Sequence, residues 1–261
     1  MKSTVFQIDT FTDRVLGGNP AVVVCLSDWL EDTTLAAIAQ EHNAPTTAFL
    51  RESGNEFEIR FFLPIGELPL VGHASLAAAH VLLKLLRPGL AAATLRRRTG
   101  MLRVSTDDDG RVAITLPAVS AEPCVTPGGL AEALGATILE VRANGAQYFA
   151  VLESAAAVAR VAPDMDALMR LDRDGLVVTA RSDDCDFVSR AFAPKEGLPE
   201  DPVCGSAHLA LVPFWAERLG KRRMRALQLS PRGGELHCRL EGDAVRLAGR
   251  CALYMAGTIA L

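Results

Sequence analysis

Residues 200–208 read Glu-Asp-Pro-Val-Cys-Gly-Ser-Ala-His, and residues 67–75 read Glu-Leu-Pro-Leu-Val-Gly-His-Ala-Ser. Both stretches continue Leu-Ala, and each follows an Arg-x-Phe-x-Pro segment that begins at Arg60 or Arg190. The shared residues fall in the same order, separated by about half the chain. This pattern indicates an internal duplication whose period is too long for a solenoid and suits two like-folded domains.

A third match follows the first two in the same order and pairs residues 98–102 with residues 232–236. Three matches in the same order in both halves indicate that the repeat extends over most of each half. We expect an N-terminal domain at residues 1–118 and a C-terminal domain at residues 119–261, with the option that the last strand, residues 252–260, crosses back to the first domain.

Composition restricts the class of protein. A hydrophobic content of 49% with 22% charged residues is typical of a globular chain, and a formal charge of −4 offers no field for nucleic acid or anionic lipid. The apolar run at residues 74–86 contains His80 and Lys84 and is shorter than the roughly 20 residues of a membrane span. No export signal precedes it, so we expect a cytoplasmic protein with a small-molecule partner, without nucleic acid or membrane.

The chain carries six cysteines without a Cys-x-x-Cys pair, which favours neither zinc nor a disulfide framework. The run Asp107-Asp108-Asp109-Gly110 resembles a calcium loop only in part. It lacks the glutamate that such a loop has at its twelfth position, so a hairpin turn is the better interpretation. We expect no metal site.

The fold class is predicted from the segments that flank each motif. Alternating strands, such as residues 4–10 and 57–62, precede a segment at residues 73–86 that is apolar nearly all round. Such a helix must be enclosed, so we expect an α/β fold in which a barrel-like sheet wraps around one central apolar helix in each domain. The second central helix, residues 206–219, contains Pro213, which predicts a kink or local irregularity.

Each motif places a glycine at the start of its buried helix, at Gly72 and at Gly205. Helix N-termini leave backbone N–H groups without partners and attract anions. Two copies related by a pseudo-twofold axis would set two such ends across an interdomain cleft, together with Ser206. We therefore expect a site for a small carboxylate.

His73, the residue after Gly72, is a candidate general acid or base near neutral pH, and the alternative is a capping histidine that only bonds backbone. His208 lies deeper in its copy and is expected to be buried. Asp201 has Leu68 as its counterpart, so it is an acid present in one half only, with a turn or helix-cap role as the alternative. Glu67 and Glu200 match each other and are predicted to stabilise the duplicated turns.

Cys204 stands where a helix N-terminus would lower the pKa of a thiol and make it reactive, and the alternative is a small packed residue. Its counterpart is Val71. An epimerase that uses one thiol on each face needs a cysteine in both copies, so the sequence argues against that two-thiol chemistry.

Four segments together resemble the PhzF (phenazine biosynthesis-like) family over essentially the whole chain: residues 18–23, 70–79, 186–190 and 200–208. The resemblance implies a diaminopimelate epimerase-like fold of two α/β domains and suggests a homodimer. It also implies isomerisation of trans-2,3-dihydro-3-hydroxyanthranilate by a glutamate general acid/base, with a histidine and an aspartate, without metal or cofactor.

His73, Gly72, Asp201, Gly205 and Ser206 occupy matching positions of the family pattern. The glutamate does not: its Ser-Glu-Thr/Ser-x-Phe segment is Pro-Thr-Thr-Ala-Phe at residues 45–49, which places Thr46 at its position. Three alternatives follow. The protein is a related isomerase or epimerase that uses His73, Asp201 or Cys204, a non-catalytic small-acid-binding protein, or a chain in which the segment aligns a few residues away.

Overall fold

The computed structural model describes residues 2–54 and 56–261 of the chain. Its internal contacts divide the chain into two compact units, Met1–Leu116 with Arg246–Leu261, and Pro117–Val245. The chain leaves the first unit close to the expected boundary at 118/119, and its closing segment returns to that unit. Within the described residues, no helix has both the length and the apolar content that a membrane crossing requires.

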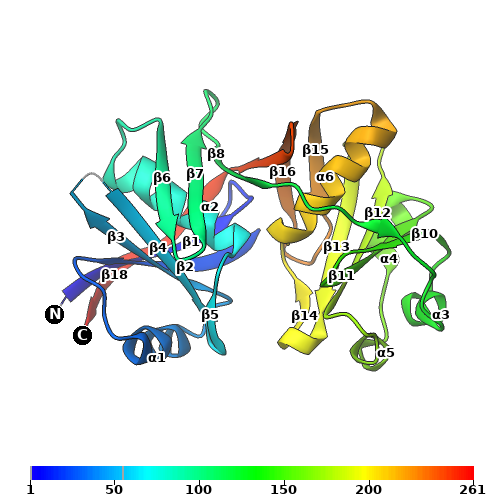
Figure 1. The fold of residues 1–261 in the computed structure, drawn as a ribbon, viewed down its shortest axis with the longest axis horizontal. Helices are drawn as coiled ribbons and strands as arrows, with labels where there is room; N and C mark the ends of the chain where they lie inside the picture. Colours follow the sequence, from blue (N-terminus) through cyan, green and yellow to red (C-terminus); the bar gives the residue numbers. More distant parts are fainter. Residues whose placement is uncertain (1, 55) are drawn as a thin grey trace. The chain divides into compact units, whose positions relative to one another are not determined.

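The first unit contains two α-helices, a π-helix and a set of strands (Figure 1). In chain order these are β1 (Lys2–Thr10), β2 (Asn19–Leu26), α1 (Asp32–His42), β3 (Thr47–Ser53), β4 (Glu56–Leu63), β5 (Gly66–Leu68), α2 (Gly72–His80), η1 (Val81–Leu86), β6 (Ala92–Arg97), β7 (Gly100–Thr106), β8 (Val112–Pro117) and finally β18 (Cys251–Ala260).

The second unit has the same kinds of element in the same order, with extra short helices. These are β9 (Glu122–Pro123), α3 (Leu130–Leu134), β10 (Ile138–Ala143), β11 (Gln147–Leu152), α4 (Ala155–Arg160), α5 (Met165–Met169), β12 (Gly175–Arg181), β13 (Phe187–Ala193), η2 (Pro194–Glu196), β14 (Leu198–Asp201), α6 (Gly205–Leu219), β15 (Arg223–Gln228) and β16 (Gly234–Glu241). Strand β17 (Ala244–Gly249) begins in this unit, and its residues from Arg246 onward belong to the first unit.

Strand pairing repeats between the units. In the first, β4 pairs antiparallel with β5 and parallel with β6, and α2 lies in the connection to β6. In the second, β13 pairs antiparallel with β14 and parallel with β15, and α6 lies in that connection. The parallel pairs β2–β3 and β11–β12 also correspond. The structure is therefore α/β, with one topology used twice.

The strand registers align the copies residue by residue. Arg97 pairs with Gly100 and Leu95 with Leu102 in the β6–β7 hairpin. In the β15–β16 hairpin, Gln228 pairs with Gly234 and Ala226 with Leu236. The glycines and leucines of the third sequence match thus occupy equivalent places, which makes Gln228 the structural counterpart of Arg97.

An arginine–glutamate pair stabilises the turn before each motif. Arg60 donates to both carboxylate oxygens of Glu67, with distances of 2.8 Å from Nε and 2.6 Å from Nη2. Arg190 donates in the same way to Glu200, at 2.7 and 2.9 Å. These bidentate pairs confirm the predicted turn-stabilising role of the two glutamates.

Each of these arginines also packs on the phenylalanine two residues further along its strand. The guanidinium carbon of Arg60 lies 5.1 Å from the ring centroid of Phe62, and that of Arg190 lies 5.1 Å from the ring centroid of Phe192. The ring and the carboxylate hold the guanidinium from two directions. The Arg-x-Phe spacing in the sequence therefore serves one structural purpose in both copies.

Helix α2 is enclosed in its unit, as its apolar sequence predicts. Residues 73–79 are all buried, and the helix contacts β1, β2, β3, β7 and β18 (Figure 1). The predicted α-helix over residues 73–86 is wrong in its second half, where Val81–Leu86 forms a π-helix. The wider turn ends with the amide of Arg87 donating to the carbonyl of Leu82 at 2.7 Å, a bond across five residues.

Helix α6 accommodates Pro213 without ending. A proline has no N–H, so the carbonyl of Leu209 loses its usual partner within the helix. That carbonyl instead accepts from the amide of Val119 at 3.0 Å, in the connecting segment of the same unit. Further along the helix, Trp215 stacks on Phe187 and donates from Nε1 to Thr179 Oγ1 at 3.0 Å. The irregularity predicted from Pro213 is thus compensated by a specific bond.

His208 is fully buried, as predicted. Its Nδ1 lies 2.8 Å from the carbonyl oxygen of Cys204, so Nδ1 carries the proton. Burial lowers the pKa of His208 to about 4, and burial lowers the pKa of His73 to about 4 as well. Both imidazoles are therefore neutral at pH 7.

We expect stability to fall as pH is lowered from 7 to 5, because the unfolded chain then protonates histidines that the folded chain keeps neutral. Each buried histidine contributes about 2 kcal/mol to this loss, from the difference between its lowered pKa and the ordinary value. Urea unfolding at pH 7, 6 and 5 measures this loss in the free energy of unfolding. His208→Gln should show a shallower loss over this range, and an unchanged pH dependence in that variant would contradict the burial of a neutral imidazole.

Candidate functional site

The N-terminus of α2 presents its first amides without a side-chain cap. The residue before it, Val71, is extended, and its carbonyl accepts from both the amide and the hydroxyl of Ser75. The amides of Gly72 and His73 have no partner within the helix because they precede its first turn of hydrogen bonds. This end of the helix is thus suited to an anion.

His73 is buried in the first turn of α2, with a relative exposure of 8%. Its Nε2 has no hydrogen-bond partner among the described residues, so the capping role considered from the sequence is not seen at this atom. A buried polar atom without a partner is unusual, and it indicates a group that a ligand can complete. With its lowered pKa, the imidazole offers a neutral nitrogen that can bind or accept a proton.

The N-terminus of α6 is held from the neighbouring strand. Gln228, at the end of β15, accepts from the amide of Cys204 at 2.9 Å through Oε1 and donates to the carbonyl of Asp201 at 2.7 Å through Nε2. Ser230 donates to the carbonyl of Pro202 at 2.7 Å. Sequence reasoning missed Gln228, and its only signal was its place in the third repeat match.

Asp201, Cys204 and Ser206 lie together at this end of α6. The Oδ1 atom of Asp201 accepts from the amide of Val203 at 3.2 Å, which is the turn role considered from the sequence. The Sγ atom of Cys204 lies 3.3 Å from the hydroxyl oxygen of Ser206, and Ser206 is exposed. The structure thus joins the predicted residues of the second copy around Gly205.

The expected lowering of the Cys204 pKa is wrong. Burial, together with the negative charge of Asp201, raises the pKa of this thiol to about 12. The burial of Cys204 outweighs the favourable helix end, because a thiolate there would lose its hydration. Cys204 therefore carries its proton at neutral pH, as the alternative of a packed residue predicts.

Thr46 is buried at 1% exposure immediately before β3, in the first unit. Its carbonyl accepts from the amide of Val22 at 3.0 Å, which joins it to the parallel β2–β3 pair. A hydroxyl at this place can donate or accept a hydrogen bond, but it does not titrate near neutral pH.

The segment between β1 and β2 has a strained backbone. Phe11 and Leu16 have positive φ angles of 60° and 66°, uncommon for large side chains. Gly18, with φ of 56°, is required because an added Cβ would lie 2.0 Å from the carbonyl oxygen of Thr10. The amide of Leu16 donates to Asp9 at 2.7 Å and fixes the segment. Strain of this kind often marks functional loops.

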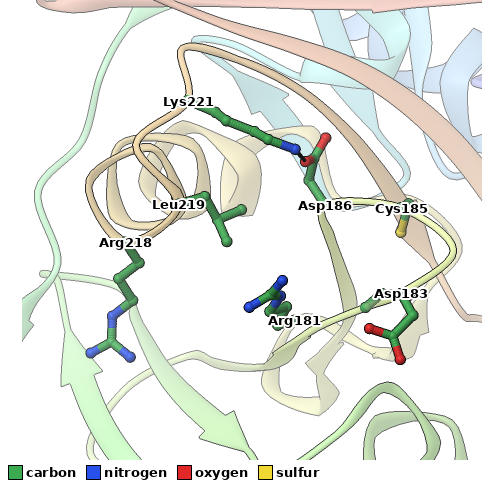
Figure 2. Close-up of a pocket in the computed structure, with 8 residues that line it drawn as sticks. Arg181, Asp183, Cys185, Asp186, Arg218, Leu219 and Lys221 are labelled. Atoms are coloured by element: carbon green, nitrogen blue, oxygen red, sulfur yellow. Dashed lines mark hydrogen bonds and ion pairs between the residues drawn. The ribbon is translucent and has the colours of Figure 1, made fainter.

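Figure 2 shows a separate cavity of about 350 Å³ at the C-terminal end of α6. Its charged groups are largely paired: Lys221 contacts Asp186 at 2.5 Å, Asp186 also accepts from the amide of Arg225, and Arg218 pairs with Glu140. None of the residues predicted for the site lines this cavity, so we do not assign the function to it. The described residues also contain no cluster of three or more His, Cys, Asp or Glu side chains placed to hold a metal ion.

The chain is similar to known proteins over its whole length. The model of the phenazine biosynthesis-like protein family, PhzC-PhzF, matches residues 8–257. An uncharacterized isomerase of Pseudomonas aeruginosa is 44% identical over 261 residues, which covers 100% of both chains. The crystal structure of a PhzF family protein of Enterococcus faecalis superposes with a TM-score of 0.95 at 37% identity, over 100% of each chain.

A hydroxyproline epimerase of Agrobacterium vitis shares the fold alone. It has a TM-score of 0.61 at 12% identity, over 100% of this chain and 93% of the epimerase. The fold is thus common to PhzF proteins and to this epimerase, as the resemblance of the sequence to the PhzF family implies. By sequence and by structure over its whole length, the chain belongs to the phenazine biosynthesis-like family, PhzC-PhzF.

Proposed function

We propose that this protein is a PhzF-like, cofactor-independent isomerase that moves a proton on a small carboxylic acid. The name of the Pseudomonas relative, an isomerase, supports the reaction class. The observation that carries the proposal is His73, a buried neutral imidazole whose Nε2 has no partner, beside the uncapped end of α2.

In the proposed site, the substrate carboxylate binds the amides at the helix ends that begin with Gly72 and Gly205, assisted by the hydroxyl of Ser206. Backbone amides at a helix end bind a carboxylate without a counter-charge that must be desolvated. For this function the two ends must face one substrate, in the interdomain cleft expected from the duplication. Asp201, present in one copy only, supplies the acidic group of the second end.

His73 is our candidate for the proton carrier in place of the family's glutamate. With a pKa near 4, its neutral form accepts a proton from the substrate, and the imidazolium so formed is a strong enough acid to return it. Cys204 is a weaker candidate because its thiol holds its proton up to a pKa of about 12. An epimerase that uses Cys204 is the less favoured alternative for the same reason.

A non-catalytic small-acid-binding protein is the second candidate function, and Thr46 favours it. The anion-binding helix ends are present, whereas the position of the general acid/base holds a hydroxyl. Losing a general acid/base typically costs about 10²–10⁴-fold in rate. Such a protein would bind small acids and leave them unchanged.

Exchange of substrate hydrogen with solvent separates the two functions. For the isomerase, incubation with 2-amino and 2-hydroxy acids in deuterated water should incorporate deuterium at the α-carbon, detected by mass spectrometry. His73→Gln should reduce the rate by about 10²-fold or more. Because His73 titrates near pH 4, the rate should stay constant from pH 6 to 8 and fall only below about pH 5.

Cys204→Ser is the matched control, since its hydroxyl fits the same buried place and we do not assign the proton to Cys204. Exchange lost in Cys204→Ser and retained in His73→Gln would assign the proton to the thiol instead. Saturable binding of the acids without any exchange would contradict the isomerase and support the binding protein.

The substitution Thr46→Glu restores the carboxyl of the family pattern. If only the proton carrier of the family's reaction is missing, this variant should isomerise trans-2,3-dihydro-3-hydroxyanthranilate at least tenfold faster than the unaltered protein, because a positioned acid/base is worth about 10²–10⁴-fold. Product formation is followed by chromatography. Thr46→Gln, of similar size and without an ionisable group, is the control. No gain over this control would exclude the family's named reaction for this pocket.

A further inference from the structure

A cavity of about 200 Å³ lies in the first unit, where β5 and β6 separate along β4. The register pairs β6 with Phe57 and Glu58 of β4, and pairs β5 with residues 61–63. Between these two stretches, the side of β4 at Ile59 and Arg60 opens onto the cavity. Its lining residues are Ile59, Arg60, Phe61, Glu67, Leu68, Pro69, Arg97, Arg98 and Thr99.

The cavity lies at the carboxyl end of β6, which is parallel to β4. Helix α2 connects β4 to β6, and the short strand β5 precedes this helix and pairs with the later part of β4. The stretch of β4 at Ile59 and Arg60 is therefore left between the two partner strands.

Arg97 brings a positive charge to this cavity, and no carboxylate of residues 2–54 or 56–261 pairs with it. Its Nη1 atom donates to the carbonyl of Pro69 and to the hydroxyl of Thr99, each at 3.2 Å, and both acceptors are neutral. Its Nε is buried and has no partner among the described residues. Burial lowers the pKa of Arg97, which shows that its surroundings disfavour the charge.

The neighbouring arginines of the lining are neutralised. Arg60 and Arg98 both contact Glu67, at 2.6 and 2.7 Å, and both also pair with Asp32. Two carboxylates thus balance two guanidinium groups. Arg97 remains as the one additional charge of the lining, beside an apolar wall formed by Ile59, Phe61 and Leu68.

The second unit has a neutral side chain, Gln228, at the position that corresponds to Arg97. There β15 stays paired with β13 one residue further, through Ser189 and Gln228. Gln228, the counterpart of Arg97, uses both ends of its amide on the turn before α6. Gln228 is therefore a buried, neutral side chain with both polar ends bonded, whereas Arg97 is charged and its Nε has no partner among the described residues.

We propose that the crevice between β5 and β6 is a binding site for a small carboxylic acid with a compact apolar body, and that Arg97 binds its carboxylate. The carboxylate would satisfy Nε and neutralise the charge that the fold leaves unbalanced. Ile59, Phe61 and Leu68 would cover the hydrocarbon part. This site is independent of the proposed isomerase activity, because it contains neither His73 nor Gly72.

The pair isovalerate and isovaleramide tests the site, since the two molecules share a shape and differ in charge. We expect isovalerate to cause saturable shifts of the backbone amide signals of Ile59 and Thr99 in an NMR titration, and isovaleramide to bind at least tenfold more weakly. Equal binding of both probes would overturn the proposal, as would the absence of saturable binding up to 50 mM. Shifts confined to Gly72 and His73 would place the carboxylate at the helix end and would also overturn it.

Arg97→Gln copies Gln228 of the second unit and should weaken isovalerate binding at least tenfold. Arg97→Lys keeps the charge but lacks the Nε donor, and it serves as the second variant if the glutamine protein does not fold; it should still bind isovalerate saturably, but more weakly than the unaltered protein. Arg96→Gln is the matched control, because Arg96 is exposed and pairs with Glu56 and Glu58. Unchanged binding in Arg97→Gln, or an equal loss in Arg96→Gln, would contradict the assignment.

Discussion

The bidentate ion pair between Arg60 and Glu67, repeated by Arg190 and Glu200, is the interaction on which the rest of each unit depends. The pair spans from a central strand to the short strand that leads into the motif helix. The side chains are largely shielded, with exposures of 10% and 22% in the first pair and 11% and 16% in the second. Removing one partner of such a shielded pair destabilises the fold, because the charge of the other partner is then left without compensation.

The same frame carries different chemistry in its two copies. The first copy has Leu68, Val71 and His73, where the second has Asp201, Cys204 and Ser206. The acid and the thiol therefore belong to one helix end and the imidazole to the other. Arg97 and Gln228 extend this asymmetry to the strand that follows each helix. A duplicated architecture thus keeps its backbone geometry constant and changes side chains at a few equivalent places, which is how a site with distinct acid and base groups can arise from two like halves.

The sequence was sufficient for those features that depend on local pattern. The three repeat matches identified the two motif helices, the apolar content of residues 73–86 predicted the enclosure of the first helix, and the shared glutamates predicted the stabilised turns. The protonation of Cys204 was not predictable in this way. A helix end is visible in the sequence, whereas full burial and the nearby charge of Asp201 appear only in the folded chain.

The roles of Gln228 and Arg97 were not predicted from the sequence, because they depend on contacts between segments that are distant in the chain. Gln228 contacts residues more than twenty positions earlier in the chain, and Arg97 contacts Pro69, so both roles depend on the parallel registers that helices α2 and α6 bring about. The π-helical turn at Val81–Leu86 was missed because its residues fit an α-helix equally well by composition. Thr46 shows the complementary case: the sequence identified the position, and the structure added its burial.

Native-state hydrogen–deuterium exchange with mass spectrometry tests most directly the claim that each ion pair fixes its own helix end. Lysine keeps the charge of arginine but lacks the fork that binds both oxygens of a carboxylate. Arg60→Lys should therefore speed amide exchange in residues 66–75 and leave residues 198–208 unchanged, and Arg190→Lys should do the reverse. Exchange that is unaltered in both variants, or that rises equally at both helix ends in either one, would contradict the account.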